Sequence, residues 1–167
     1  MQKRGVKRGG VDLGKLKGLK PDELYDLFQE FIDYAEKKGG IGKYDENNAP
    51  ISIFNEKLSN FESIVKYLRE ECKLDYKRIA LKLNRKEGPI GVIYRKAKKK
   101  FSGKPDLSSS ELFSLNIFNN KLTIFENLVF YFKREGGSFH EVASVLKRNY
   151  YTVWAVYQRA KKKGGMK

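Results

Sequence analysis

The sequence predicts an all-α protein in which a three-helix unit occurs twice in tandem. Three observations support this prediction. Apolar residues recur at helical spacing, Ser or Thr stands three positions before Glu where helices should begin, and residues 51–101 resemble residues 115–163. A basic segment and an acidic amphipathic helix are expected before the two copies.

Residues 1–20 contain seven Lys or Arg, one Asp and five Gly, with few apolar side chains. Such a segment cannot bury enough surface to offset its chain entropy, so we expect a disordered basic arm. The arm could serve only as a solubilising tail, or it could contact the phosphate backbone of DNA. The second alternative would involve Lys3, Arg4, Lys7 and Arg8.

Residues 21–38 predict a helix that begins at Pro21 and carries six acidic residues against two lysines. Its apolar residues follow one helical face: Leu24, Leu27, Phe28, Phe31, Ile32 and Ala35. Because a negative helix binds phosphate poorly, we expect it to pack on a repeat, to self-associate, or to bind another protein such as RNA polymerase. Residues 39–50 read as a linker.

The internal repeat is gapless over its first part, where Ile53–Glu62 matches Ile117–Glu126 at a spacing of 64 residues. Beyond Glu71 and Glu135 the spacing becomes 63. Two copies with so long a period favour tandem domains over a solenoid. The predicted modules are residues 51–101 and 115–163, separated by a linker at 102–114 and followed by a tail at 164–167.

Each module is predicted to contain three helices. The first begins at a capping box, Ser59-x-x-Glu62 or Thr123-x-x-Glu126. The second begins after Asp75 or at Ser138-x-x-Glu141, is short, and leads through a tight turn into the third. The residues expected to face inward on the third helices are Ile90, Tyr94 and Ala97, and Val153, Tyr157 and Ala160. Residues 51–54 and 115–118 could be extended arms or a two-stranded patch.

A short helix with Val142-Ala143-x-x-Leu146 spacing, a tight turn and a following helix predict a helix-turn-helix. With Thr152-Val153 and the run 157–162, Tyr-Gln-Arg-Ala-Lys-Lys, this stretch resembles region 4 of bacterial sigma factors, within the homeodomain-like helix-turn-helix superfamily. The resemblance implies recognition helices at residues 88–100 and 150–163. The sequence departs from the family at the turn, where a frequent glycine is replaced by Asn84 and Lys147.

A helical wheel divides the candidate DNA contacts into two groups. Side chains that could reach base edges are Tyr151, Gln158 and Arg159 in the second copy and Arg95 and Lys96 in the first. Candidate phosphate contacts within the copies are Arg85, Lys86, Lys98, Lys99, Lys100, Arg148, Lys161, Lys162 and Lys163. The first copy looks more like a phosphate clamp, and a structural role against the turn is favoured for Trp154.

Other chemistries find little support in the sequence. One cysteine and one histidine cannot form a disulfide framework or a Cys/His zinc site, so we expect no metal and no cofactor. No nucleophile–base set or phosphate-binding glycine loop is recognisable, so we expect no enzyme. No apolar run is long enough to span a bilayer, and we expect a cytoplasmic, nucleoid-associated protein.

A net charge of +15 favours a polyanionic partner. The leading hypothesis is a double-stranded DNA-binding transcription regulator with two helix-turn-helix modules. Two alternatives stay open: an architectural nucleoid protein with little sequence preference, and an adaptor that binds proteins of the transcription machinery.

Overall fold

The computed structural model describes residues 18–37 and 46–164. The chain divides into two units, residues 1–41 and 42–167. Seven α-helices, two short 3₁₀ helices and one two-stranded sheet form the described part, so the protein is mostly helical as predicted. The predicted arm at residues 1–17, most of the linker and the tail beyond Gly164 lie outside the described residues.

The first unit contributes one helix, α2 (Pro21–Lys37), which matches the predicted acidic helix. Its apolar side chains are exposed over the described part: Leu24 by 41%, Leu27 by 43%, Phe28 by 62% and Phe31 by 56%. None of the residues described in this unit covers these four side chains.

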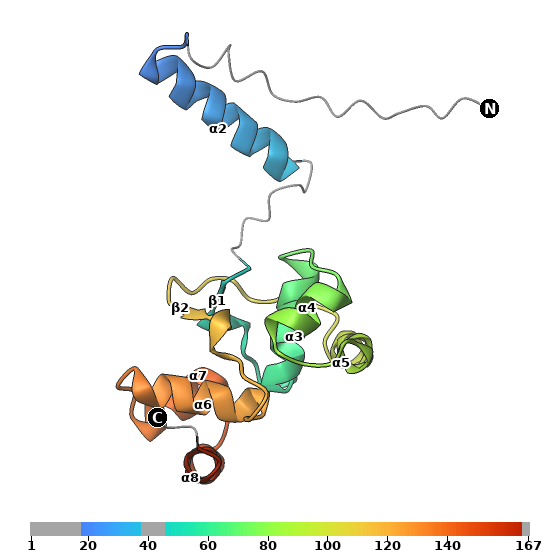
Figure 1. Ribbon diagram of the computed structural model, residues 1–167, viewed down its shortest axis with the longest axis vertical. Coiled ribbons are helices and arrows are strands. Elements are labelled where there is room, and N and C mark those ends of the chain that lie inside the picture. Colours follow the sequence, from blue (N-terminus) through green and yellow to red (C-terminus); the bar gives the residue numbers. More distant parts are fainter. Residues whose placement is uncertain (1–17, 38–45, 165–167) are drawn as a thin grey trace, which may run out of the picture. The chain divides into compact units, whose positions relative to one another are not determined.

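The second unit contains both copies of the repeat, and each copy forms three helices (Figure 1). The helices of the first copy are α3 (Asn60–Glu70), α4 (Tyr76–Lys82) and α5 (Glu87–Lys100). Those of the second copy are α6 (Ile124–Arg134), α7 (Phe139–Leu146) and α8 (Tyr150–Lys162).

The predicted capping residues begin these helices. In α3, α6 and α7 the hydroxyl of Ser59, Thr123 or Ser138 accepts from the backbone N–H of the Glu three residues on, and that Glu carboxylate accepts from the N–H of the cap. Asp75 caps α4 through the N–H of Arg78 at 2.7 Å. These caps satisfy amides that have no partner within the helix, and they confirm the predicted helix starts.

The two copies are joined by an antiparallel ribbon of β1 (Asn48–Pro50) and β2 (Leu112–Ser114). Ala49 pairs with Phe113, and these two residues are 64 positions apart, which is the spacing of the repeat. Equivalent residues of the two copies thus face each other across an antiparallel pair. This is the arrangement of a local two-fold axis that relates one copy to the other.

The ribbon corrects two predicted boundaries. β1 lies in the segment predicted as a linker at 39–50, and β2 lies in the one predicted at 102–114. Neither strand could be predicted from its own residues, because each is defined by its pairing with a strand of the other copy. For residues 51–54 and 115–118 the sequence left two predictions open, an extended arm or a strand. In the structure these segments begin with the 3₁₀ turns η1 (Ile51–Ile53) and η2 (Leu115–Ile117).

One apolar core runs through both copies. It contains Ile64, Tyr67 and Leu68 of α3 together with Leu128 and Val129 of α6, and none of the five has measurable exposure. Phe113 of β2 stacks on Phe54 of the first copy at 5.3 Å between ring centroids and lies 5.8 Å from Phe132 of α6. The two copies therefore form one compact unit.

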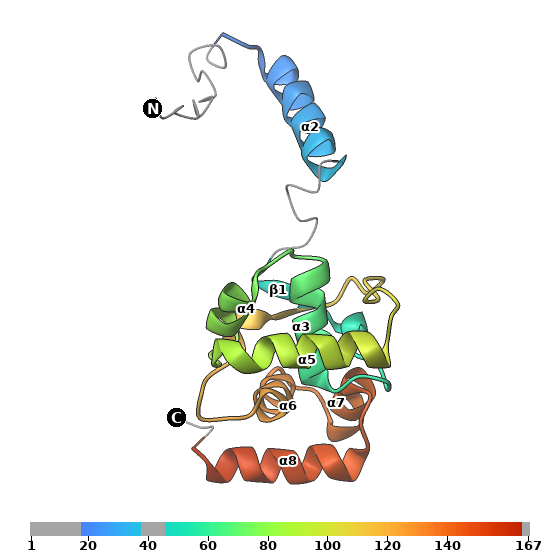
Figure 2. The same ribbon diagram turned by 90° about the vertical axis from the view of Figure 1, so that its right-hand side faces the viewer.

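The third helices of the two copies, α5 and α8, lie at the end of this unit away from the ribbon. Figure 1 shows both helices end-on, so their axes are roughly parallel. In Figure 2 both run across the unit with α6 drawn between them, and the chain passes along them in opposite directions. The local two-fold axis thus leaves the ribbon at one end of the unit and emerges between α5 and α8 at the other.

Candidate nucleic-acid interface

Two arginines hold the copies together at equivalent positions. The guanidinium of Arg85, just after α4, donates to the backbone carbonyls of Asn119 and Leu122 in the second copy, at 2.8 and 2.5 Å. Arg148, just after α7, donates in the same way to the carbonyls of Asn55 and Leu58 in the first copy. Burial lowers the pKa of both guanidinium groups, which still remain charged at neutral pH.

The side-chain amides of two asparagines add further bonds between the copies. Asn84 donates to the carbonyl of Phe118 at 2.8 Å, and Asn60 donates to the carbonyl of Leu146 at 3.0 Å. Together with the arginines, these bonds fix the turn of each copy against the start of the first helix of the other copy and the segment before it. The positions of α5 and α8 relative to each other are set by this exchange.

Two lysines at the ends of the third helices bind carboxylates of the same copy. Lys100 lies 2.7 Å from Glu62, and Lys163 lies 2.7 Å from Glu126. Burial is the largest single influence on the pKa of both carboxyl groups and would raise it. The hydrogen bonds from the lysine and from the capping residue outweigh it, so each pKa lies below its ordinary value. These ion pairs attach each third helix to the first helix of its copy.

Four residues of the predicted phosphate set thus have partners inside the protein. Arg85 and Arg148 bind backbone carbonyls, and Lys100 and Lys163 bind glutamates. We therefore assign these four a structural role and leave them out of the candidate interface. Nothing in the sequence indicated these partners, because they are distant along the chain.

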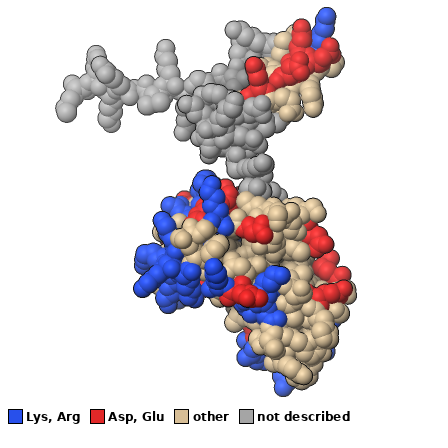
Figure 3. Space-filling model, turned by 180° about the vertical axis from the view of Figure 1, so that it is seen from behind, with Lys and Arg blue, Asp and Glu red and all other residues tan. Residues whose placement is uncertain are grey.

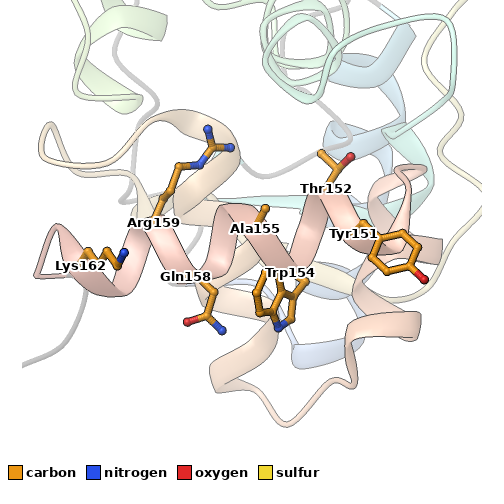
Figure 4. A pocket seen from close by; sticks show the side chains of 7 residues that line it. All are labelled: Tyr151, Thr152, Trp154, Ala155, Gln158, Arg159 and Lys162. Carbon is orange, nitrogen blue, oxygen red and sulfur yellow. The ribbon is translucent and has the colours of Figure 1, made fainter.

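The outward surface of α8 is a shallow hollow lined by residues of this helix alone (Figure 4). Its lining residues are Tyr151, Thr152, Trp154, Ala155, Gln158, Arg159 and Lys162. Thr152, Ala155 and Arg159 point to one side of the helix, and Trp154 and Gln158 point to the other (Figure 4). All three base-facing residues predicted for this copy are part of this surface.

Trp154 differs from its predicted role. The sequence favours packing against the turn, whereas the indole retains 47% exposure on the outward surface of α8. The difference arises because Val153, Val156 and Ala160 form the buried stripe, while Tyr157 is only half-buried against Phe139 at 5.4 Å between ring centroids. The sequence did not predict Trp154 on the outward surface because the wheel counted Tyr157, rather than Val156, as inward.

The outward surface of α5 is basic and nearly free of large side chains. The predicted Arg95 and Lys96 are exposed, as are Lys98 and Lys99 in the last turn. At the position equivalent to Trp154 lies Gly91, which is buried, and a Cβ there would stand 3.4 Å from the ring of Tyr76. The first copy thus has no counterpart of the exposed indole.

Basic residues gather on the side of the unit where α5 lies, as the space-filling view shows from behind (Figure 3). The opposite edge of that view, toward the ribbon, is occupied mainly by acidic and uncharged residues. The remaining members of the predicted phosphate set, Lys86, Lys161 and Lys162, are exposed at the ends of α5 and α8. A polyanion would meet positive potential at the end of the unit that presents the third helices.

The turns before the third helices share one backbone conformation. Asn84 and Lys147 both adopt the left-handed region, with φ of 50° and 52°. Asparagine tolerates this region better than lysine does. The turn is therefore kept in both copies even where the residue type does not favour it.

The described part of the chain holds no group of three or more His, Cys, Asp or Glu side chains that could bind a metal ion. His140 is exposed, with its ring 4.5 Å from that of Tyr150, and Cys72 is half-buried beyond the end of α3. None of the described helices is long and apolar enough to cross a membrane. Lys3, Arg4, Lys7 and Arg8 lie outside the described residues.

Comparison of the chain with protein-family models, with curated proteins and with solved structures found no match. The geometry and chemistry of α5 and α8 are therefore the basis for inferring a function.

Proposed function

We propose that this protein binds double-stranded DNA through α5 and α8, as a regulator of transcription built from two helix-turn-helix modules. One observation carries the proposal. Two equivalent helices, each preceded by a short helix and a tight turn, run in opposite directions at one end of a single unit. Dimeric helix-turn-helix proteins present two recognition helices to successive major grooves in this manner.

The charge on these helices supports a duplex partner. Apart from Lys100, which pairs with Glu62, α5 carries Lys98 and Lys99 in its last turn, and α8 carries Arg159, Lys161 and Lys162. Cations at helix C-termini also interact with the helix dipole, so their presence alone does not decide for DNA. Their position on both helices at the same end of the unit is what favours phosphate contact.

A salt titration of duplex binding tests the proposal. Affinity for a duplex of about 30 base pairs should fall steeply as salt rises, because each neutralised phosphate contributes about 0.9 to the log–log slope. The double variants Lys96→Ala/Lys99→Ala in α5 and Arg159→Ala/Lys162→Ala in α8 should each lower that slope by up to about 2.

A charge-matched control lies near the ribbon. Arg78 pairs with Glu46, and Lys82 donates to Asn47, next to β1. The variant Arg78→Ala/Lys82→Ala removes the same charge and should leave the slope unchanged. A salt-independent affinity, or an equal loss in the control, would refute binding through α5 and α8. A ratio near one between the affinities for a selected duplex and for a random duplex would favour the architectural alternative.

A second surface favours a protein partner. The exposed apolar residues of α2 stand on a helix whose described charges between Pro21 and Phe31 are all acidic. We propose that this face binds protein, with the transcription machinery as the leading candidate. The variant Leu27→Ser/Phe31→Ser should abolish copurification that survives nuclease treatment while leaving duplex affinity unchanged. Retention of the partner by this variant would contradict the assignment.

A further inference from the structure

We infer that the DNA target is not palindromic. In one half-site α8 contacts base edges, and in the other α5 contacts only the phosphate backbone. This inference rests on the proposed function. It assigns the two half-sites of one target to the two copies within a single chain, so that one molecule of protein occupies the whole target.

The scaffold that supports the two helices is nearly symmetric. Arg85 and Arg148 make equivalent bonds to the opposite copy, and Lys100 and Lys163 make equivalent ion pairs. The ribbon pairs Ala49 with its own equivalent, Phe113. A duplex would therefore meet α5 and α8 in equivalent orientations, and any difference between the half-sites must come from the side chains on the two helices.

The exposed faces of the two helices differ at equivalent positions. Along α8 the face presents Tyr151, Ala155, Gln158 and Lys162. The equivalent positions of α5 hold Gly88, Val92, Arg95 and Lys99. The two helices share the lysine at the end and a basic residue at one further position, Arg159 in α8 and Lys96 in α5.

The α8 face has the chemistry of base reading. The Gln158 amide can donate to and accept from the edge of adenine. Trp154, exposed by 47%, points to the same side of α8 as Gln158 and provides apolar surface beside it. Tyr151, exposed by 76%, and Ala155 add apolar surface elsewhere along the helix, and such surface suits the methyl group of thymine. The half-site under α8 is therefore expected to contain A·T pairs.

The α5 face has the chemistry of backbone contact. Gly88 would have nothing within 4 Å of an added Cβ, so this end of the helix is bare. The Arg95 guanidinium folds back along the helix, with Nη1 3.6 Å from where a Cβ of Gly91 would stand. With Lys98 and Lys99 exposed in the following turn, the cations of α5 are spread along the helix and suit phosphates of either strand.

Selection from random duplex at near-physiological salt tests the inference. The wild-type chain should select one information-rich half-site flanked, about one helical turn away, by a segment of unrestricted sequence. Gln158→Ala should reduce the preference for the selected site over random duplex about 5- to 150-fold and leave the salt slope unchanged. Arg95→Ala, at the equivalent position, should reduce affinity for both duplexes equally.

A variant that transfers α8 residues to the equivalent positions of α5 tests the inference more directly. The variant Gly88→Tyr/Val92→Ala/Arg95→Gln gives α5 the residues that α8 has at three equivalent positions, and no atom lies within 4 Å of an added Cβ at Gly88. This variant should select two inverted copies of the half-site. The fluorescence of Trp154, the single tryptophan of the chain, should respond to the selected half-site in both proteins and verify that α8 is engaged.

The outcomes separate this inference from the proposed function. No salt-dependent duplex binding would refute the proposed function and the inference with it. Binding of the wild-type chain to two equivalent inverted half-sites would refute only the inference. Binding without any selected motif would also refute the inference and would favour the architectural alternative.

Discussion

Replacing Arg85 by alanine should destabilise the two-copy unit by about 2–4 kcal/mol. The guanidinium donates to two carbonyls of the second copy, Asn119 O and Leu122 O. A hydrogen bond that involves a charged group contributes about 1.5–3 kcal/mol. We take the lower part of the summed range because Arg85 is only half-buried and water can reach the freed carbonyls in part.

Urea unfolding followed by circular dichroism measures this loss, and a thermal scan should show a fall in Tm of about 10 °C. Lys86→Ala is the matched control: Lys86 is exposed and makes no capping bond through its side chain, so its removal should change the free energy of unfolding by less than about 0.5 kcal/mol. Arg85→Lys keeps the positive charge but cannot donate to both carbonyls as the planar guanidinium does. It should therefore recover less than half of the stability that Arg85→Ala loses. An Arg85→Ala protein as stable as wild type, but with a lower salt slope in DNA binding, would refute the structural role and restore phosphate contact.

Three further predictions concern stability. Because the pKa of Glu126 is lowered in the folded protein, its contribution is present above its ordinary pKa and is lost as pH falls through the folded value. The free-energy difference between wild type and Glu126→Gln should thus be largest near neutral pH and vanish in acid, and a difference independent of pH would contradict the ion pair. Lys147→Asn should stabilise by up to about 1 kcal/mol in urea unfolding, because asparagine tolerates the left-handed turn better; a loss of stability would contradict this. Phe113→Ala should cost about 3–5 kcal/mol by the same measurement, since the ring is 1% exposed and packs on both copies, and a cost below about 1 kcal/mol would show that the ribbon does not anchor the core.

The helices and their starts could be predicted because their signals are local. In a capping box the hydroxyl residue and the Glu that completes the reciprocal hydrogen bonds are three residues apart, and an apolar stripe repeats within two turns. Ser59, Thr123 and Ser138 were therefore sufficient to begin three of the helices. The repeat itself predicted that both copies would have the same three helices.

The joining of the copies could not be predicted from these signals. β1 and β2 are each three residues long, too short for an alternating pattern, and each is defined by its partner in the other copy. The carbonyl partners of Arg85 and Arg148 are backbone atoms, which leave no trace in the sequence. The recurrence of both arginines was visible, and it indicates only that the position matters in both copies.

The candidate interface was predicted in part. Tyr151, Gln158 and Arg159 lie together on the outward surface of α8, where the helical wheel placed them. Trp154 joins them because the stripe of small apolar residues, Val153, Val156 and Ala160, packs inward more closely than a stripe through Tyr157 would. A wheel assigns each residue an angle, whereas the size of the side chains decides which face of the helix comes closest to the core.

Hydroxyl-radical footprinting of the wild-type chain on a selected duplex tests the central claim most directly. The account predicts a complex of one chain with one duplex, with two protected stretches of backbone about 10 base pairs apart on the same face. Lys96→Ala/Lys99→Ala should weaken protection of one stretch, and Arg159→Ala/Lys162→Ala should weaken protection of the other. A single protected stretch, or one that both variants weaken equally, would contradict binding through α5 and α8.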